Sequence, residues 1–360
     1  MRGDAVSPRK EQRGRVLGAL VTLLLIGAAA AAAGYLWLRD NYEAPGPNAS
    51  LTRIEVAPGT SLRSVLTHVQ SDGVMRNARA VAWYLKVKGL NPKVQSGTYE
   101  IPARASASEI LQLFADGKVV LEQLTVVEGA TFANFLEVLN AQPHVQHTLK
   151  GKTAAQIMTA LGHPQEDPEG RFFPDTYRFA AGTPDSVILG LAYDAMQREL
   201  AGVWQARSSG LPLDSPYQAL ILASLVEKEA ELKSERAAIA GVFVNRLRKG
   251  MRLQSDPTVI YGLGENYDGS VHARDLQTDT PYNTYTRDGL PPTPIALPGR
   301  ESLLAAVQPE DTGALFFVAT GAGDGAHHFS RTLEEHNQAV QAYLTRLRSQ
   351  GHLHPSTGQP

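Results

Sequence analysis

The sequence predicts an α+β protein that a single N-terminal helix anchors in a membrane. An uncharged apolar run opens the chain, short strand–turn–helix phrases follow it, and helical spacing of aliphatic residues dominates the second half. The chain has 360 residues, of which 43% are hydrophobic and 19% charged, as in ordinary globular proteins. That length predicts two or three domains with a sizeable core.

The predicted transmembrane segment is Val16 to Leu38, because at about 1.5 Å per helical residue it spans roughly 30 Å of hydrocarbon. Tyr35 and Trp37 lie near its far end, where amphipathic rings favour the membrane interface. Basic side chains precede it and favour a cytoplasmic N-terminus: Arg2, Arg9, Lys10, Arg13 and Arg15. A cleaved signal peptide is the alternative, since the alanine run 28–33 offers cleavage sites, but its apolar core would be only about 7–15 residues long. We therefore expect a cytoplasmic tail at 1–15, a single-pass inner-membrane anchor at 16–38, and the rest of the chain on the periplasmic side.

Composition excludes several classes of function. The chain contains no cysteine, so disulfides and thiolate chemistry are excluded. A formal charge of −2 gives no support for a nucleic-acid partner, which would require a basic face. A metalloenzyme using His327, His328 and His336 is an alternative, but their spacing matches no tight zinc site, and we expect neither a metal nor a cofactor.

A strand–turn–helix phrase occurs twice after a polar linker at 39–52. VAPGTSLRSVL (56–66) matches VVEGATFANFL (126–136), with Gly59 over Gly129, which predicts two related βα units. The phrase resembles the opening of LysM modules, which bind glycans containing N-acetylglucosamine; an ordinary strand–turn–helix connection is the alternative. With a hairpin arm at 95–102 and a helix at 106–114, the first copy predicts a LysM-like region at 53–122. A second βα region and connection follow at 123–212, and their aromatic run GRFFPDTYRF (170–179) is expected to be core rather than a sugar-facing wall.

The second half is predicted to contain two helices and one long polar loop. Ser215, Pro216 and Gln218 mark a helix start, with a capping serine, a proline at the first position and a glutamine placed for a capping box. This helix is expected to run to about Glu231, and a second helix to span about 234–249 before Gly250. Periodicity then disappears from 251 to 298, where dense polar and aromatic residues indicate a functional loop. We assign 213–345 to one domain and 346–360 to a flexible tail.

Three glutamates lie near the end of the first of these helices: Glu227, Glu229 and Glu231. Glu229 shares a helical stripe with large aliphatic residues, namely Leu222, Leu225 and Val226, whereas Glu227 faces a smaller and more polar surface. A carboxyl group against aliphatic side chains loses hydration in its charged form, which raises its pKa and lets it act as an acid near neutral pH. A break in the helix near Lys233 is required, since that charge would oppose the effect. A paired structural glutamate is the alternative.

Several motifs resemble the endolytic murein transglycosylase family: LASLVEKEA (222–230), SERAAIAGVFVNRLRKGMRLQSDPTVIYGLG (234–264), YNTYTRDGLPPTPIALPG (282–299), HHFSRTLEEHN (327–337) and FPDTY (173–177). The resemblance covers nearly everything from 54 to 345 and implies a LysM-like region joined to a lysozyme-like lytic transglycosylase catalytic domain, here 213–345. The lysozyme-like lytic transglycosylases carry a catalytic glutamate on a helix, followed by serine or threonine, and that glutamate aligns with Glu229. Ala230 departs from this Glu-Ser or Glu-Thr pattern, which removes a possible hydrogen bond beside the acid.

The resemblance also implies the reaction. Glu229 would protonate the oxygen that links N-acetylmuramic acid (MurNAc) to N-acetylglucosamine (GlcNAc) in peptidoglycan, and would then take the proton of the muramoyl C6 hydroxyl as a 1,6-anhydro ring closes. One carboxylate then suffices, whereas most glycosidases need two. Peptidoglycan glycan strands near their site of synthesis are the expected substrate, and cell-wall synthases are partners suggested by the family alone. A glycan-binding scaffold and a conventional hydrolase are the rival interpretations.

The long polar loop supplies candidates for contacts to the sugar. Charge that develops on the sugar ring must be met by preplaced dipoles, for which Gln254, Ser255, Asn283 and Tyr285 are the candidate substrate-binding residues. Asp256 is expected to cap the loop before Pro257 rather than to take part in catalysis.

Overall fold

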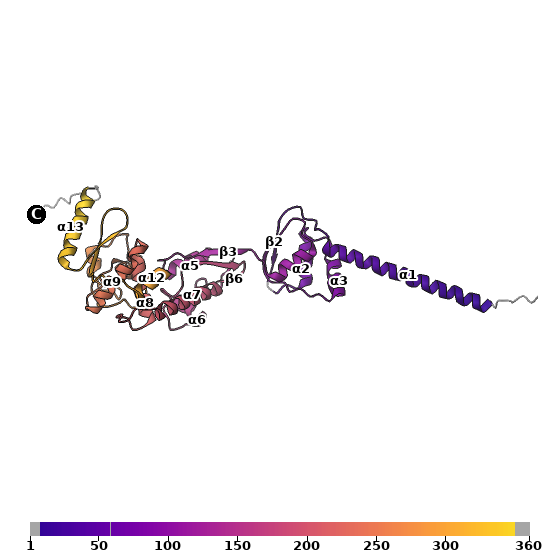
Figure 1. The fold of residues 1–360 in the computed structure, drawn as a ribbon, viewed down its shortest axis with the longest axis horizontal. Helices are drawn as coiled ribbons and strands as arrows, with labels where there is room; N and C mark the ends of the chain where they lie inside the picture. Colours follow the sequence, from indigo (N-terminus) through magenta and orange to yellow (C-terminus); the bar gives the residue numbers. More distant parts are fainter. Residues whose placement is uncertain (1–7, 58, 350–360) are drawn as a thin grey trace, which may run out of the picture. The chain divides into compact units, whose positions relative to one another are not determined.

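The computed structural model describes residues 8–57 and 59–349, and it is a mixed structure of helices and short strands (Figure 1). This confirms the α+β class. Two compact units are present: unit 1 comprises the described residues up to Glu122 together with 180–182, and unit 2 comprises 123–179 and the described residues from 183 onward. Pro58 in the first copy of the repeated phrase, residues 1–7 of the tail expected at 1–15, and 350–360 lie outside the described residues.

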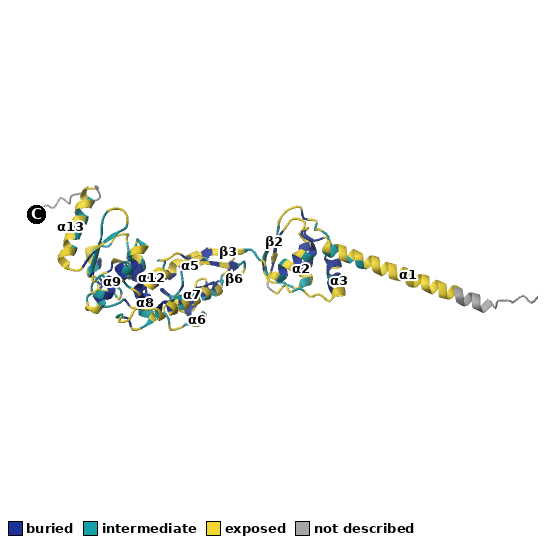
Figure 2. Cartoon of the chain, viewed as in Figure 1, coloured by how far each residue is buried: buried dark blue, intermediate teal, exposed yellow. Residues whose placement is uncertain are grey.

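Helix α1 (Pro8–Glu43) carries the expected anchor. In the described part of the chain it is the one helix long and apolar enough, by length and composition, to cross a membrane. From Val16 to Trp37 its large apolar side chains are exposed, and this part of the ribbon is mostly yellow in Figure 2. The helix continues past the expected end at Leu38, where Arg39 and Glu43 form an ion pair of 2.8 Å one turn apart.

The segment expected to be a polar linker, 39–52, is ordered against unit 1. It contains the last turn of α1, and beyond it Asn48 is buried and donates hydrogen bonds from its amide to the carbonyl oxygens of Ser50 and Pro102. The backbone N–H of Gly46 donates to the carbonyl of Arg104. Polar residues here bind backbone groups of the folded unit, which composition alone does not reveal.

Unit 1 is a two-stranded sheet covered by short helices. Strands β1 (Thr52–Val56) and β2 (Gly97–Ile101) pair antiparallel, which confirms a strand at 95–102; the two strands are connected through two helices and do not form the expected hairpin. Helices α2 and α4 begin at capping serines, Ser61 and Ser106, close to their expected starts. An unexpected helix, α3, starts at the Asn77 cap and ends at left-handed Gly89. The helices are α2 (Leu62–Ser71), α3 (Ala78–Lys88) and α4 (Ala107–Asp116).

The repeated phrase adopts the same local geometry in both copies. Gly59 and Gly129 each have φ 77°, and each precedes a helix capped by a hydroxyl side chain, Ser61 in α2 and Thr131 in α5. A left-handed residue at this turn favours glycine because a side chain would be strained there. The internal echo is therefore a shared strand–turn–helix conformation.

The first part of unit 2 holds small paired strands and helices around an aromatic core. Phe172, Tyr177 and Phe179 are buried, so the aromatic run belongs to the core as expected. β3 pairs with β5, and β4 with β6 in parallel. The elements are β3 (Leu121–Thr125), α5 (Phe132–Asn140), β4 (Val145–Gln146), α6 (Ala154–Ala160), β5 (Thr176–Ala180), β6 (Thr183–Pro184) and α7 (Asp185–Gln205).

The second part of unit 2 is built around helix α8. Met196 and Leu200 of α7 share one core with α8, so the boundary expected at 212/213 falls inside a continuous core. The loop expected at 251–298 contains helices α10 and α11, and the expected tail begins inside α13. The elements are α8 (Pro216–Glu229), the 3₁₀ turn η1 (Lys233–Glu235), α9 (Arg236–Arg248), α10 (Asp256–Leu263), the 3₁₀ turn η2 (Gly264–Asn266), α11 (Ala273–Gln277), α12 (Arg300–Val307), β7 (Phe316–Ala319), β8 (His327–Ser330) and α13 (Leu333–Ser349).

Candidate active site

Helix α8 runs through the core, and its first turn is capped by a side chain. The Ser215 hydroxyl accepts the N–H of Gln218, and Pro216 occupies the first position, as expected. The expected capping box does not close, because the Gln218 side chain accepts the N–H of Asp214 instead. All residues from Ala219 to Val226 are buried, so α8 passes through the core and brings its C-terminal glutamates to the edge of that core.

The helix ends at Glu229, two residues earlier than expected. Ala230 is extended, with ψ 103°, and the chain turns away from the helix axis. Lys233 is thereby directed elsewhere, with its Nζ 3.7 Å from Glu301 Oε2. The break that the argument for Glu229 requires is present.

Glu229 is held as a carboxyl group with little solvation. Ser255 donates a hydrogen bond of 2.6 Å from its Oγ to Glu229 Oε1. Burial of the carboxyl group raises the pKa of Glu229 to about 7; the Ser255 hydrogen bond opposes the rise, the charge of Asp256 adds to it, and His327 and Arg246 oppose it. The residue as a whole is only partly buried, and a carboxyl group with this pKa remains largely protonated near neutral pH.

Glu227 has a different environment from the one that helical spacing predicted. Its side chain is 5% exposed rather than on a more polar surface, and its Oε1 lies 2.8 Å from Arg236 Nη2. Its Oε2 accepts the N–H of Gly299. Arg236 also reaches Glu301 at 2.8 Å and Glu128 at 3.4 Å. Glu227 is therefore the paired structural carboxylate, whereas Glu229 accepts a hydrogen bond from a neutral hydroxyl.

Ser255 is placed to position Glu229. It is 1% exposed, precedes α10, and its N–H donates to Thr284 Oγ1 at 3.0 Å. The Ser255 hydroxyl contacts the carboxyl group of Glu229 and does not face an open surface. Ala230, the residue after Glu229, has no hydroxyl to donate. Ser255 supplies that hydroxyl to Glu229 from outside helix α8.

Gln254 is exposed and has an unusual backbone. Its φ is 52°, in the left-handed region that a non-glycine residue rarely adopts. Arg246 fixes this turn by donating from Nη1 to the carbonyl of Leu253 at 2.8 Å and to Gln254 Oε1 at 3.2 Å. The Nε of Arg246 donates to the carbonyl of Leu315 at 2.7 Å, so one guanidinium joins this turn to the chain leading into β7.

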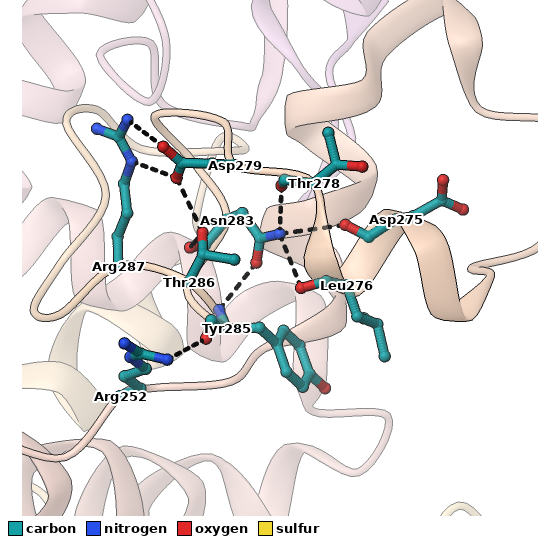
Figure 3. A network of polar contacts seen from close by, with 9 residues as sticks. All are labelled: Arg252, Asp275, Leu276, Thr278, Asp279, Asn283, Tyr285, Thr286 and Arg287. Atoms are coloured by element: carbon teal, nitrogen blue, oxygen red, sulfur yellow. Dashed lines mark hydrogen bonds and ion pairs between the residues drawn. The ribbon is translucent and has the colours of Figure 1, made fainter.

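Asn283 holds the loop together and has no exposed surface (Figure 3). Its amide nitrogen donates to three backbone carbonyls, those of Asp275, Leu276 and Thr278, and its oxygen accepts the N–H of Tyr285. Each polar atom of the side chain is used inside the loop. The structure therefore contradicts the expectation that Asn283 contacts sugar.

Tyr285 and Asp256 form a pair beside the acid. The Tyr285 hydroxyl donates to Asp256 Oδ1 at 2.5 Å, and burial raises the pKa of Tyr285. Asp256 is exposed and is the first residue of α10; Ser255 occupies the capping position, so Asp256 is not the cap that was expected before Pro257. The negative charge of Asp256 contributes to the raised pKa of Glu229.

Two features of unit 2 were not predicted from sequence. The β7–β8 hairpin carries His327, whose Nδ1 lies 2.8 Å from Glu235 Oε2 and whose N–H also donates to Glu235. Glu169 is a second buried carboxyl group, and burial raises its pKa to about 7. It accepts the N–H of Phe132 and the hydroxyl of Tyr261, so it holds the start of α5. The sequence signals for the His327–Glu235 pair were the SER motif at 234–236 and the adjacent histidines, but neither pattern indicates that the two residues are partners.

Comparison with known proteins agrees with this arrangement. A family model described as the YceG-like family matches residues 54–342. The chain belongs to this family. A Bacillus subtilis (strain 168) protein named endolytic murein transglycosylase is 32% identical over 81% of this chain and 84% of its own length. A Streptococcus pneumoniae protein of the same name is 26% identical over 91% of this YceG-like chain, which covers 65% of that longer protein.

A solved structure also resembles this YceG-like protein. The crystal structure of a yceG-like protein from Listeria monocytogenes has a TM-score of 0.51 and 31% sequence identity, and the match covers 81% of this chain and 99% of that one. The family resemblance inferred from the motifs is confirmed by these relatives.

Proposed function

We propose that this YceG-like protein is an endolytic murein transglycosylase, a lyase that cuts peptidoglycan glycan strands. Family membership and the names of the relatives in Bacillus subtilis and Streptococcus pneumoniae support the activity. The observation that carries the proposal is Glu229, a carboxyl group at the end of a core helix with a pKa of about 7 and a neutral hydroxyl as its hydrogen-bond donor.

Glu229 acts as acid and then as base in this mechanism. In its protonated form it donates to the oxygen between MurNAc and GlcNAc, and the C1–O bond breaks as positive charge develops at C1. The carboxylate that results accepts the proton of the muramoyl C6 hydroxyl while O6 bonds to C1, which leaves a 1,6-anhydro-MurNAc end. A group whose pKa is near the working pH suits both proton transfers. No water is consumed.

Surrounding residues have distinct proposed roles. Ser255 orients the carboxyl group and stabilises its charged form between the two proton transfers. Gln254 and Tyr285 remain the proposed sugar contacts, since Gln254 is exposed and Tyr285 lies against Asp256 next to the acid. Arg246 holds the Gln254 turn in place.

The location of the reaction is part of the proposal. With α1 as a single-pass anchor and its basic N-terminus in the cytoplasm, both units lie on the periplasmic side of the inner membrane, near nascent strands. Unit 1 is proposed to be LysM-like and to bind glycan, and the part of unit 2 around α8 to be lysozyme-like. Cell-wall synthases are the proposed protein partners.

The test is product analysis on intact glycan strands. We expect the full chain to release anhydro-MurNAc ends, detected by mass spectrometry, and Glu229→Gln to lower the rate at least about 100-fold, since a general acid contributes roughly 10²–10⁴-fold. Glu169→Gln is the matched control, because it removes the other buried carboxyl group with a pKa of about 7. It should retain activity.

Three outcomes would contradict the proposal in different ways. Reducing ends in place of anhydro ends would indicate a hydrolase, in which Asp256 could serve as the second carboxylate. Strand binding without cleavage would indicate a scaffold. Full activity of Glu229→Gln would remove Glu229 from the mechanism.

A further inference from the structure

Helix α3 of unit 1 is apolar on two faces. Its inner face is buried against the unit through Ala80, Val81, Tyr84 and Leu85. The other face exposes Trp83 at 58%, Val87 at 58% and, one residue past the Gly89 cap, Leu90 at 49%. Trp83 and Val87 lie one turn apart on α3, at positions i and i+4, and Leu90 follows the Gly89 cap, so three exposed apolar side chains gather at the C-terminal end of α3; we call them the apolar strip. Such an exposed strip marks a surface that meets an apolar partner.

The same helix contacts α1 at the edge of its apolar run. The Tyr84 ring stacks on Tyr42 with centroids 4.5 Å apart and lies 6.2 Å from Tyr35. At the C-terminal end of α3, the Nζ of Lys88 lies 5.5 Å from the Tyr35 ring. At the other end, Arg76 lies 3.8 Å from Asp40, which follows the apolar run. The C-terminal end of α3 is therefore the end nearer to the apolar part of α1.

The position of Tyr35 along α1 determines at which depth in a bilayer this contact lies. Tyr35 lies three residues before Leu38, the last residue of the apolar run, which is about 5 Å along a helix axis at about 1.5 Å per residue. Once α1 spans a bilayer, Tyr35 falls at the boundary between hydrocarbon and headgroups, where tyrosine is favoured. A helix end in contact with Tyr35 reaches the same depth.

We propose that Trp83, Val87 and Leu90 form a second membrane contact, which lies in the headgroup region of the bilayer that α1 crosses. Lys86 and Lys88 flank the strip and are placed to meet anionic lipid headgroups. The Nζ of Lys86 lies 5.1 Å from the Trp83 ring, so cation and indole occupy the mixed polar and apolar layer together. The inference rests on the anchor in the proposed function and adds that unit 1 rests on the membrane instead of projecting freely from it.

Charge supports a lipid surface as the partner. The α3 sequence ARAVAWYLKVK contains Arg79, Lys86 and Lys88 and no acidic residue. Two acidic groups at the end of α1 that contacts α3, Asp40 and Glu43, have cationic partners in Arg76 and Arg39. Each basic residue near an anionic surface contributes on the order of 1 kcal/mol to binding.

Tryptophan fluorescence of the full chain in lipid vesicles tests the proposal. The chain contains three tryptophans, Trp37, Trp83 and Trp204, so phenylalanine substitution of two of them leaves each one as a single reporter. With lipids brominated at different depths, we expect Trp83 to be quenched most strongly by bromines near the headgroups. Trp37 in α1 reports whether the anchor is inserted, and Trp204 on α7 is the reference outside unit 1.

The possible outcomes separate this inference from the anchor. Quenching of Trp37 with no quenching of Trp83 would overturn the membrane contact and leave the anchor intact. Absence of quenching at both would overturn the anchor and this inference together. Lyase activity is measured separately, and its result tests the proposed reaction independently of the membrane contact.

A variant of the strip gives a second measurement. We expect Val87→Asp with Leu90→Asp to reduce Trp83 quenching at least twofold and to shift its emission to the red, because two charges keep the strip out of the headgroup layer. Val127→Asp in unit 2, a change at a residue that is 65% exposed, is the matched control and should leave Trp83 quenching unchanged. Equal quenching in the strip variant and the parent would contradict the proposal.

Discussion

At the scale of single residues, the site consists of one acid and the hydroxyl that holds it. Ser255 donates to Glu229 and stabilises its charged form, so the hydroxyl lowers a pKa that burial raises. The two effects together hold the acid at a pKa of about 7. Removal of the hydroxyl should therefore change the pH dependence of the reaction and not only its rate.

We predict that Ser255→Ala moves the alkaline limb of the pH–rate profile to higher pH. Activity requires protonated Glu229 and is lost as pH rises through its pKa; without the Ser255 hydrogen bond the pKa rises and the limb follows. The rate at the optimum should fall roughly tenfold, because the carboxyl group is less well oriented. Rates of anhydro-end formation from pH 5 to 9 check this. An unchanged profile, or a limb displaced toward acid, would contradict the role given to Ser255.

Residue patterns predicted which glutamate is the acid candidate but not the roles of the loop residues. Glu229 could be singled out because helical periodicity places it beside Leu225 and Val226. The amide of Asn283 could bind a sugar or the backbone, and only the fold brings three carbonyls to it. Ser255 was selected for polarity, but its contact with Glu229 joins residues 26 positions apart, which no local pattern reveals.

At the scale of elements, Arg236 joins the segments that fix the end of α8. It lies at the start of α9, its side chain is 7% exposed, and it contacts Glu227 of α8, Glu301 of α12 and Glu128 before α5. The carboxylate of Glu227 is held two residues from the acid, so this ion pair fixes the turn in which Glu229 ends the helix.

We predict that Arg236→Met destabilises the protein by about 3 kcal/mol, because Glu227 is left as a buried charge without its partner. The double variant Arg236→Met with Glu227→Gln should recover part of that loss, since no buried charge remains. Urea unfolding of the detergent-solubilised full chain measures both. If the double variant is as unstable as the sum of the two single variants, the two residues do not act as a pair.

Helix ends with side-chain caps were predictable at the element scale, and short amphipathic helices between loops were not. Ser61, Ser106 and Ser215 each lie at the start of a helix that the sequence indicated. Helix α10 was missed because Pro257 and the nearby glycines indicate a loop, whereas Thr258 and Val259 are buried and hold the segment in a helix through tertiary contacts.

At the scale of the whole molecule, two buried carboxyl groups link stability to pH. Glu169 and Glu229 each have a pKa raised from 4.5 to about 7, because burial disfavours the charged form. For such a group the folded state binds the proton more tightly than the unfolded state. Its contribution to stability is complete below about pH 4.5 and is lost as pH rises through about 7. At roughly 1.4 kcal/mol per pKa unit, each group costs about 3 kcal/mol at pH 8 relative to its protonated form.

We therefore predict that Glu229→Gln, the variant expected to lower activity at least about 100-fold, stabilises the protein at alkaline pH. A neutral amide avoids burial of a charge, so the free energy of unfolding should exceed that of the parent by about 2 to 3 kcal/mol more at pH 8 than at pH 4.5. Urea unfolding of the full chain in detergent at the two pH values measures the difference. Unit 1 and α1 are the same in the variant and its parent, so their contribution to the free energy of unfolding cancels. Glu227→Gln is the control with the opposite sign at pH 8, because it removes the carboxylate that pairs with Arg236 at 2.8 Å and should weaken the protein there. A Glu229→Gln variant with the same pH dependence as its parent would mean that the carboxyl group is solvated in the folded protein, and the acid would then lack the raised pKa on which its proposed chemistry depends.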